Sequence, residues 1–423
     1  MSEISTTMNH LNKWVTIAIV NLSVVALLGL VMRLKMIFSI PFIDFKYILH
    51  AHSHFAFGGW VTLALLALFS YKLLPHSQNR KPIYNWLLGG IFFNACGMLL
   101  SFPFQGYGIF SILFSTLFIF TTYAYAVVFI RDLRNTQVNP TVKLLATASV
   151  VYMVLSSAGA FTLAYLLATK STNVFLYKDA IYTYLHLQYN GFFTLAIFSL
   201  MIHHLELYGK GSRTFAQLMN IAVLPSMFMS YLWHYPDMAI RIVAIAGSAL
   251  VITATIWFFI MLARNWERFK HLKRATRNIA TLAMISFALK MIFQSLTIIP
   301  SLGPLVFANR PVIIGFLHLV LLGFVTLYLL AHFIQCGLFP DRRHAILSVA
   351  LFIVGVLINE VVLLTQGLGV MLMISSKMAN WLLLGAAGLL FLGGLLMAIS
   401  KIRSNGALKM HFSPRSMKSL SQS

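Results

Sequence analysis

Residues 48–74 read ILHAHSHFAFGGWVTLALLALFSYKLL, and stretches of this kind decide the fold. About 20 consecutive apolar residues are enough for a helix to cross the hydrocarbon core of a bilayer. Such stretches recur along the whole chain of 423 residues, which is 59% hydrophobic and only 9% charged. Because lipid offers no hydrogen-bond partner to a backbone, runs this long and continuous predict membrane-spanning α-helices.

The pattern predicts an all-α, polytopic membrane helix bundle with twelve transmembrane helices in the lipid bilayer. The expected spans are 15–37, 48–74, 84–103, 107–131, 144–169, 179–204, 215–236, 239–263, 278–299, 311–335, 344–367 and 378–401. We expect residues 1–403 to form one transmembrane domain. Residues 404–423 are rich in Ser and Lys, which predicts a disordered cytoplasmic tail.

The net charge of +22 comes from basic residues that concentrate in alternate loops and in both tails. The largest group is the six Lys and Arg from Arg264 to Arg277. By the positive-inside rule this bias predicts that both termini are cytoplasmic, as an even number of spans requires. A topology signal and attraction to anionic lipid are sufficient to explain the charge, so no nucleic-acid partner is expected.

Two cysteines occur, Cys96 and Cys336, and they lie far apart. Their spacing excludes a disulfide scaffold, an iron–sulfur pattern and a CxxCH haem attachment.

Four histidines from four different spans fall in one membrane layer: His52, His186, His234 and His318. Three of these spans enter from outside, which places their histidines about 5–12 Å below the outer boundary, and His234 lies slightly shallower. Imidazole is costly in hydrocarbon, so such residues either bond neighbouring helices or serve a function. Histidines that meet at one depth can hold a metal or a haem between them.

His50 and His54 accompany His52 in the second span. The i,i+4 spacing puts His50 and His54 on one helix face. His52 points about 200° away from His50, so these two cannot face the same cofactor. Periodicity alone does not choose between the two faces, and all three residues stay candidates.

Two ionisable groups lie deep within spans. Lys290 is in the middle of the ninth span, and Glu360 is the one acid deep in a span. Such groups are functional candidates by default, here for a proton path. The alternative is a structural hydrogen bond between helices.

The motifs around the histidines resemble those of haem-copper oxidase catalytic subunits (subunit I), closest to the C-family oxidases and nitric oxide reductases. The second span, with His50-Ala-His52-Ser-His54 and the apolar run after it, is similar to the family's second helix, which supplies a low-spin haem ligand. The sixth span, with His186 and then Gly191-Phe-Phe, resembles the helix that supplies a copper ligand. Two further spans complete the resemblance, the seventh ending Trp-His234-Tyr235-Pro and the tenth carrying Gly315-Phe-Leu-His318.

The sequence departs from the family pattern at two places. The family's tenth helix carries His-x-His, but the first of these positions is Phe316, so the ligand of the oxygen- or nitric-oxide-binding haem is missing. The family's seventh helix carries a His-His pair for copper, and Tyr231 and Leu232 stand there instead.

The resemblance implies an integral membrane redox protein that holds a low-spin haem b between His52 and His318. His186 and His234, with help from Tyr235, are candidates for copper or a catalytic centre, as in an oxidoreductase that reduces oxygen or nitric oxide. Arg310 at the outer surface is a candidate partner for haem propionates. The resemblance also implies a bacterial inner membrane location and an electron-donor subunit of the cytochrome c type.

Two other interpretations stay open. A transporter or proton channel would use the intramembrane His, Lys290 and Glu360 without haem. A haem/copper membrane protein similar to the NnrS family, whose members also carry His-Ala-His in an early helix, fits the sixth and tenth spans less well.

Overall fold

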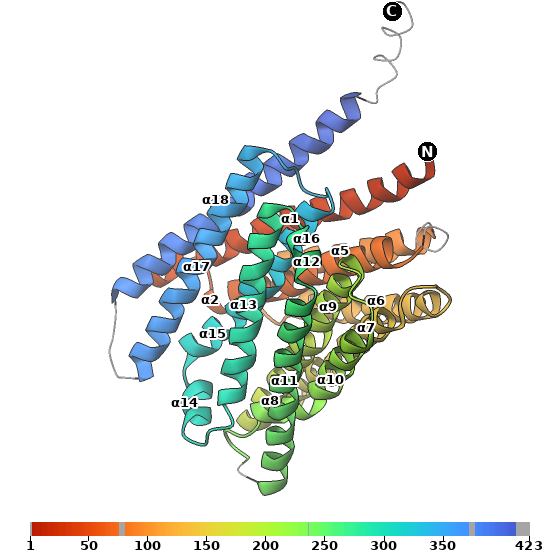
Figure 1. The fold of residues 1–423 in the computed structure, drawn as a ribbon. Coiled ribbons are helices and arrows are strands. Elements are labelled where there is room, and N and C mark those ends of the chain that lie inside the picture. The colour runs from red at the N-terminus through yellow and green to blue at the C-terminus, as the bar shows by residue number, and fades with distance from the viewer. Residues whose placement is uncertain (1, 76–80, 236, 372–376, 412–423) are drawn as a thin grey trace, which may run out of the picture.

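The computed structural model describes residues 2–75, 81–235, 237–371 and 377–411, and every regular element within them is helical (Figure 1). Eleven helices are long and apolar enough to cross a membrane. This confirms the expectation of a polytopic helical bundle.

Eight of the elements are long uninterrupted helices: α1 (Ser2–Ile37), α5 (Pro82–Gln105), α6 (Ile109–Arg134), α7 (Pro140–Ala168), α11 (Met238–Arg264), α13 (Arg274–Leu296), α17 (Arg343–Met371) and α18 (Lys377–His411). Shorter elements join them: α10 (Lys210–Met227), η4 (Phe228–Ser230), α12 (Trp266–Lys270) and α14 (Leu302–Ala308).

The remaining three spans are continuous but change helix type along their length. They are α2 (Phe45–Phe55), η1 (Ala56–Thr62), α3 (Leu63–Leu68) and η2 (Phe69–Leu73); then α8 (Val174–His186), η3 (Leu187–Phe193) and α9 (Thr194–His204); then α15 (Arg310–His318), η5 (Leu319–Thr326) and α16 (Leu327–Gln335). The segments η1, η2, η3 and η5 are π-helical. π-Helical turns are rare and occur frequently at functional sites.

Helix α10 corresponds to the expected span 215–236, but it is not among the eleven helices that meet the criteria for a membrane span. It has 18 residues, and its first turns, KGSRTFAQ, are polar, which lowers its mean hydropathy. The helix packs along α11, which does qualify.

Local sequence explains where several helices begin. Asp44 and Asp237 each accept hydrogen bonds from backbone N–H groups in the first turn of α2 and α11, and Asn173 does so for α8. These side chains satisfy backbone donors that have no partner within the helix. Pro82 and Pro140 lie in the first turn of α5 and α7, where a missing N–H costs nothing.

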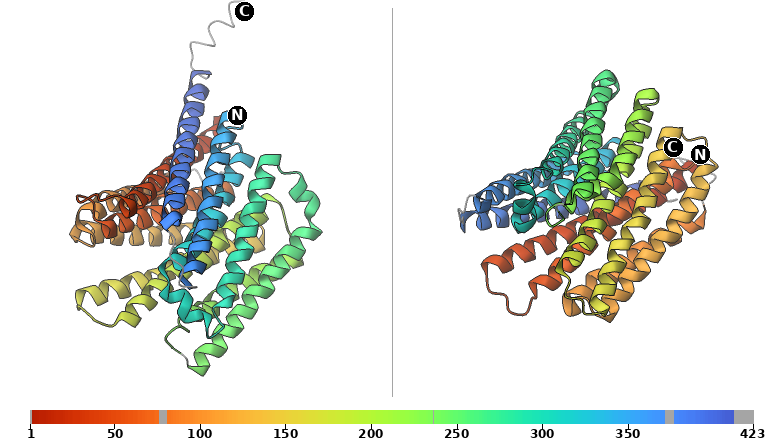
Figure 2. Two further views of the ribbon diagram at one scale, coloured as in Figure 1. Left: turned by 90° about the vertical axis from the view of Figure 1, so that its left-hand side faces the viewer. Right: turned by 90° about the horizontal axis from the view of Figure 1, so that it is seen from below.

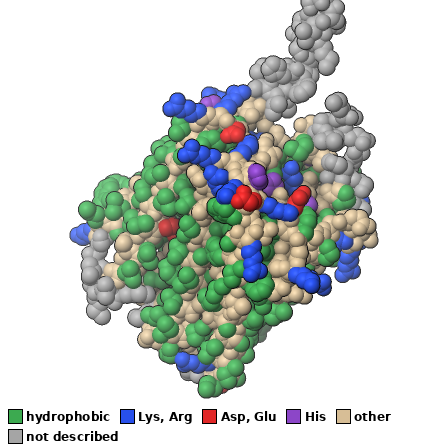
Figure 3. Space-filling model, viewed as in Figure 1, with side chains coloured by type: hydrophobic (Ala, Val, Ile, Leu, Met, Phe, Trp, Pro, Cys, Tyr) green, Lys and Arg blue, Asp and Glu red, His purple; other side chains and the backbone are tan. Residues whose placement is uncertain are grey.

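The core lies between the three spans that change helix type. The residues of η1 and η3 are all buried, and aromatic rings from four further elements meet around Phe198 on α9. Large apolar side chains such as Phe104, Ile109 and Val127 remain exposed on outer helices. Figure 3 shows hydrophobic side chains over much of the lower part of one face, with Lys and Arg gathered towards its upper part. An apolar exterior of this kind suits contact with lipid.

The beginning of α1 and the end of α18 lie at the same end of the bundle (Figure 1). Asn12 Nδ2 donates to Asn405 Oδ1 at 2.8 Å, and Asn405 Nδ2 donates to Thr16 Oγ1 at 2.8 Å. The two helices pack lengthwise against each other (Figure 2). Helix α18 continues to His411, so the first residues of the segment 404–423 are helical, and residues 412–423 lie outside the described residues.

Candidate functional site

The His52 ring on α2 faces α1. Its Nδ1 lies 3.0 Å from the carbonyl oxygen of Val25, and the ring packs over Gly29, where an added Cβ would be 3.4 Å from Cε1. Because a carbonyl can only accept, Nδ1 carries the proton and Nε2 keeps its lone pair. Among the described residues, Nε2 has no hydrogen-bond partner.

His318, the last residue of α15, has the same arrangement. Its Nδ1 donates to the carbonyl oxygen of Ile314, one turn earlier, at 2.8 Å. Its Nε2 likewise finds no partner in the described part of the chain. Histidines that ligate metals usually donate their other ring N–H to a carbonyl or carboxylate in this way.

His52 and His318 lie in one region of the structure. The imidazoles of His52 and His318 lie close enough to interact electrostatically, and each also interacts with the guanidinium of Arg33 on α1. Arg33 in turn interacts with Arg310 at the start of α15. Three different spans therefore meet in one region towards the end of the bundle where α1 finishes.

The two arginines carry positive charge that no acid balances among the residues described. Arg33 Nη1 contacts Met36 Sδ at 3.7 Å, and the Arg310 guanidinium lies 5.3 Å from the centroid of the Phe45 ring. No ion pair in the described ranges includes either residue. Two unpaired guanidinium groups near each other favour an anionic ligand.

Side chains in this region are less buried than those of the core. Helix α15 has no buried residue, although six of the eight residues of η5, directly after it, are buried. His52 and residues 28–35 of α1 are also only partly buried.

His50 and His54 lie on the opposite side of α2, against α5. The His54 ring stacks on Phe102 with a centroid separation of 4.6 Å, and its Nε2 is 3.2 Å from the Tyr107 hydroxyl. His50 packs edge-on against Tyr107 at 4.6 Å, and its buried Nε2 has no partner. The structure thus separates these two residues from the face that carries His52.

His186, the last residue of α8, is fully buried, and both of its ring nitrogens are occupied. Nε2 lies 2.9 Å from the carbonyl oxygen of Val223, and Nδ1 lies 3.1 Å from Asn190 Nδ2. Since the carbonyl accepts from Nε2–H, Nδ1 accepts from the Asn190 amide. In this arrangement His186 has no free lone pair for a metal.

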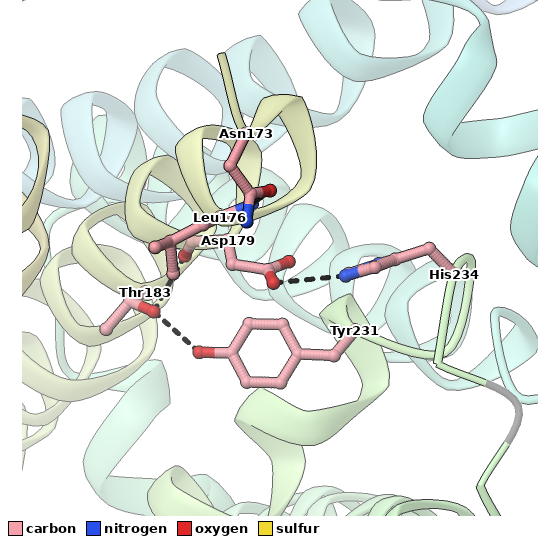
Figure 4. A network of polar contacts seen from close by, with 6 residues as sticks. All are labelled: Asn173, Leu176, Asp179, Thr183, Tyr231 and His234. Atoms are coloured by element: carbon pink, nitrogen blue, oxygen red, sulfur yellow. Dashed lines mark hydrogen bonds and ion pairs between the residues drawn. The ribbon is translucent and has the colours of Figure 1, made fainter. Parts of the chain in front are cut away.

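His234 belongs to a different network, shown in Figure 4. Its Nε2 lies 3.1 Å from Asp179 Oδ2, and Tyr231 bonds Thr183 one turn further along α8. Its Nδ1 is buried without a partner. Asp179 precedes His186 by seven residues, about 10 Å along the helix, so His234 and His186 are bound at different levels. The Tyr235 ring lies tilted beside the His234 ring, with 4.1 Å between centroids, and is exposed.

Lys290 and Glu360 have separate surroundings. Lys290 on α13 is fully buried and donates to Thr194 Oγ1 at 3.2 Å, with the Tyr189 ring 5.4 Å away. Glu360 on α17 accepts from the neighbouring Asn359 amide at 3.1 Å. No contact in the described structure joins the two residues.

Three features of the structure were not predicted from the sequence. Arg33 looks like an ordinary basic residue near the end of a span, so its position beside both histidines depends on helix packing. The π-helical segments that follow His186 and His318 directly, and His52 closely, have no recognised sequence signal. A cluster of His204, His332 and Cys336 at the other end of the bundle was also missed, although its i,i+4 spacing of His332 and Cys336 was available.

No protein-family model and no curated protein matches the sequence.

Proposed function

We propose that this chain is an integral membrane redox protein that binds one low-spin haem b between His52 and His318. The observation that carries the proposal is the matched state of the two imidazoles. Each donates Nδ1–H to a backbone carbonyl and keeps Nε2 free, and the two rings lie within electrostatic range of each other.

Residues near the two histidines also suit a bound haem. Porphyrin needs apolar contacts around the ring and cations near its carboxylates. Phe45, whose ring lies 5.3 Å from the Arg310 guanidinium, supplies an apolar ring at the site, and Arg33 and Arg310 supply unpaired positive charge. The partly exposed side chains of α15 are consistent with a face that a ligand completes.

The protein's own contribution is orientation and charge. The Val25 and Ile314 carbonyls fix the tautomer and direction of the two ligands, and the arginines favour bound carboxylates. A bis-imidazole haem supplies one-electron transfer with little rearrangement. An electron donor of the cytochrome c type is the corresponding partner.

The proposal stops at electron transfer. The hydrogen bonds of His186 and the pairing of His234 with Asp179 leave no shared pair of ligands for copper. Phe316 occupies the position at which the family places a second haem ligand. Reduction of oxygen or nitric oxide is therefore not part of the proposed function.

We further propose twelve crossings, with α10 as the seventh, in the manner of an oxidase subunit I. Hydrogen bonds between the start of α1 and the end of α18 support an even number of crossings, because an odd number would separate the chain ends. The basic loops support a cytoplasmic location for both ends in a bacterial inner membrane.

Electron paramagnetic resonance of the purified, oxidised protein tests the ligand set. We expect the signal of a low-spin ferric haem with two imidazole ligands, at one haem per chain. A high-spin ferric signal, or protein that contains no haem after expression with adequate haem supply, would contradict the proposal.

Lys290 favours a second candidate function, proton transfer across the bundle. The residue is fully buried with no acidic partner in the described structure, and its one hydrogen-bond partner is Thr194 at the junction of η3 and α9. An ammonium group held in this way is a functional candidate rather than a structural ion pair. The test is proton flux into liposomes that contain the haem-free protein. Flux in the wild type that is lost in Lys290→Met would favour this function over the first.

A further inference from the structure

The His204–His332–Cys336 cluster, named here the inner cluster, lies at the opposite end of the spans that carry His186 and His318. His204 is the last residue of α9, His332 lies on α16, and Cys336 follows α16 directly. His332 comes 14 residues after His318 in one continuous span, which separates them by about 20 Å. The inner cluster is therefore distinct from the proposed haem site.

The geometry of the inner cluster is that of a set of metal ligands. One donor atom from each of the three side chains lies within 4.8 Å of the other two. The Cys336 Sγ and His332 Nε2 atoms are 3.5 Å apart, since the i,i+4 spacing places them on one face. The His204 and His332 rings meet edge to face, with 5.3 Å between centroids.

Neighbouring groups support the three side chains without competing for their donor atoms. The Tyr328 ring stacks on His332 at 5.9 Å, which holds the imidazole in place. His203, next to His204, hydrogen-bonds instead to the Lys72 backbone and to the Tyr208 hydroxyl, so its ring is held by groups outside the cluster. His332 is buried while His204 and Cys336 are partly exposed, which leaves a way in for an ion.

Charge helps to select the metal. No acid takes part in the inner cluster, and the Lys72 ammonium is near enough to act on both His204 and His332. One thiolate offsets the charge of a monovalent cation, whereas a divalent ion would leave net positive charge beside Lys72. Uncompensated charge is costly away from water. Thiolate and imidazole ligands suit both Cu⁺ and Zn²⁺, so this charge balance favours copper.

We propose that the inner cluster binds one copper ion as Cu⁺ through the thiolate of Cys336 and the imidazoles of His204 and His332. Binding replaces the thiol proton of Cys336 by a copper–sulfur bond, and the proton is released to solvent. The two imidazoles bind as neutral ligands. No electron is exchanged in this step, because copper enters in its reduced form.

Anaerobic titration of the full-length protein in detergent with the Cu⁺–bicinchoninate complex tests the proposal. We expect the wild type to remove one Cu⁺ per chain from the chelator and Cys336→Ser to remove none. The matched controls Cys96→Ser and His203→Ala should bind as the wild type does, because neither residue belongs to the inner cluster. His204→Ala should weaken binding, and size-exclusion chromatography shows which variants are folded.

A second measurement uses Cys96→Ser, in which Cys336 is the one thiol left. Bound Cu⁺ should protect this thiol from maleimide, and His332→Ala should remove the protection. Equal copper uptake by the wild type and Cys336→Ser would overturn the proposal, as would displacement of Cu⁺ by an equal concentration of Zn²⁺. Neither readout depends on haem, so failure here is separable from failure of the proposed function.

Discussion

At the scale of single residues, hydrogen bonds decide which intramembrane histidines are available as ligands. His52 and His318 each use one nitrogen on a backbone carbonyl, whereas His186 uses both of its nitrogens. The four histidines were predicted from the sequence to share one layer, but their partners could not be. The choice of His52 over His50 and His54 depends on which helix packs against each face of α2. Those helices, α1 and α5, are both apolar, so their sequences do not show which face each one covers.

Replacing Arg33 tests the charge at the proposed haem site. Arg33→Gln removes a cation near both ligands. The loss of this positive charge favours the oxidised, more positive form of a bound haem. We expect the midpoint potential to fall by about 60 mV, a tenfold change in a one-electron equilibrium. A redox titration of purified protein measures this.

The control for Arg33 is Lys35→Gln, two residues along the same helix. Lys35 donates to the Ile40 carbonyl and takes no part in the arginine pair. Equal potentials for the wild type and Arg33→Gln, or an equal fall in both variants, would count against placing Arg33 at the haem.

At the scale of elements, the spans were predictable and their internal changes were not. Continuous apolar runs predict helices to within a few residues, as for 311–335 against α15 to α16 at 310–335. The π-helical segments have no comparable pattern, because a π-turn arises from packing against neighbours rather than from local sequence. The polar start of α10 gives this helix a lower mean hydropathy than the membrane-spanning helices have.

The hydrogen bond from Trp60 Nε1 to Thr326 Oγ1 joins η1 to η5, and so ties together the spans that carry His52 and His318. It is buried and 2.9 Å long. Thr326→Val leaves the indole N–H unsatisfied, which costs about 1–3 kcal/mol. We expect a lower midpoint of thermal unfolding in detergent for this variant. Thr116→Val on exposed α6 should have little effect, and equal stability of the two variants would contradict the role of the bond.

Gly159 allows α7 and α8 to approach each other closely. A Cβ at this position would lie 2.4 Å from the Ala180 carbonyl oxygen and 2.8 Å from the Tyr184 backbone nitrogen. Since backbone cannot move aside cheaply, Gly159→Ala should destabilise the bundle by about 1–3 kcal/mol. Gly388→Ala on α18 meets nothing within 4 Å and should be neutral or stabilising by up to about 1 kcal/mol. Chemical unfolding of both variants measures these changes in stability. A Gly159→Ala variant as stable as the wild type would contradict the need for close approach of α7 and α8.

At the scale of the whole molecule, the chain ends and the basic loops support the proposed topology. The start of α1 and the end of α18 are joined by hydrogen bonds and lie at one end of the bundle, which is consistent with twelve crossings. The count of twelve was predicted from hydropathy, while eleven helices meet the criteria in the structure. The difference is α10 alone.

Reporter fusions test this topology. A fluorescent reporter, which matures only in the cytoplasm, should be active at both the N-terminus and the C-terminus. An alkaline phosphatase reporter placed between α7 and α8, near Ser171, should be active on the other side of the membrane. Termini on opposite sides would leave α10 out of the membrane and contradict the twelve-span arrangement.

The most direct test of the central claim is the reduced-minus-oxidised optical spectrum of membranes that contain each histidine variant. The wild type should show a b-type haem spectrum, and His52→Ala and His318→Ala should each abolish it. His54→Ala, on the same helix as His52 but facing α5, should keep it. A spectrum that survives in His318→Ala, or a wild type without any haem signal, would contradict the account.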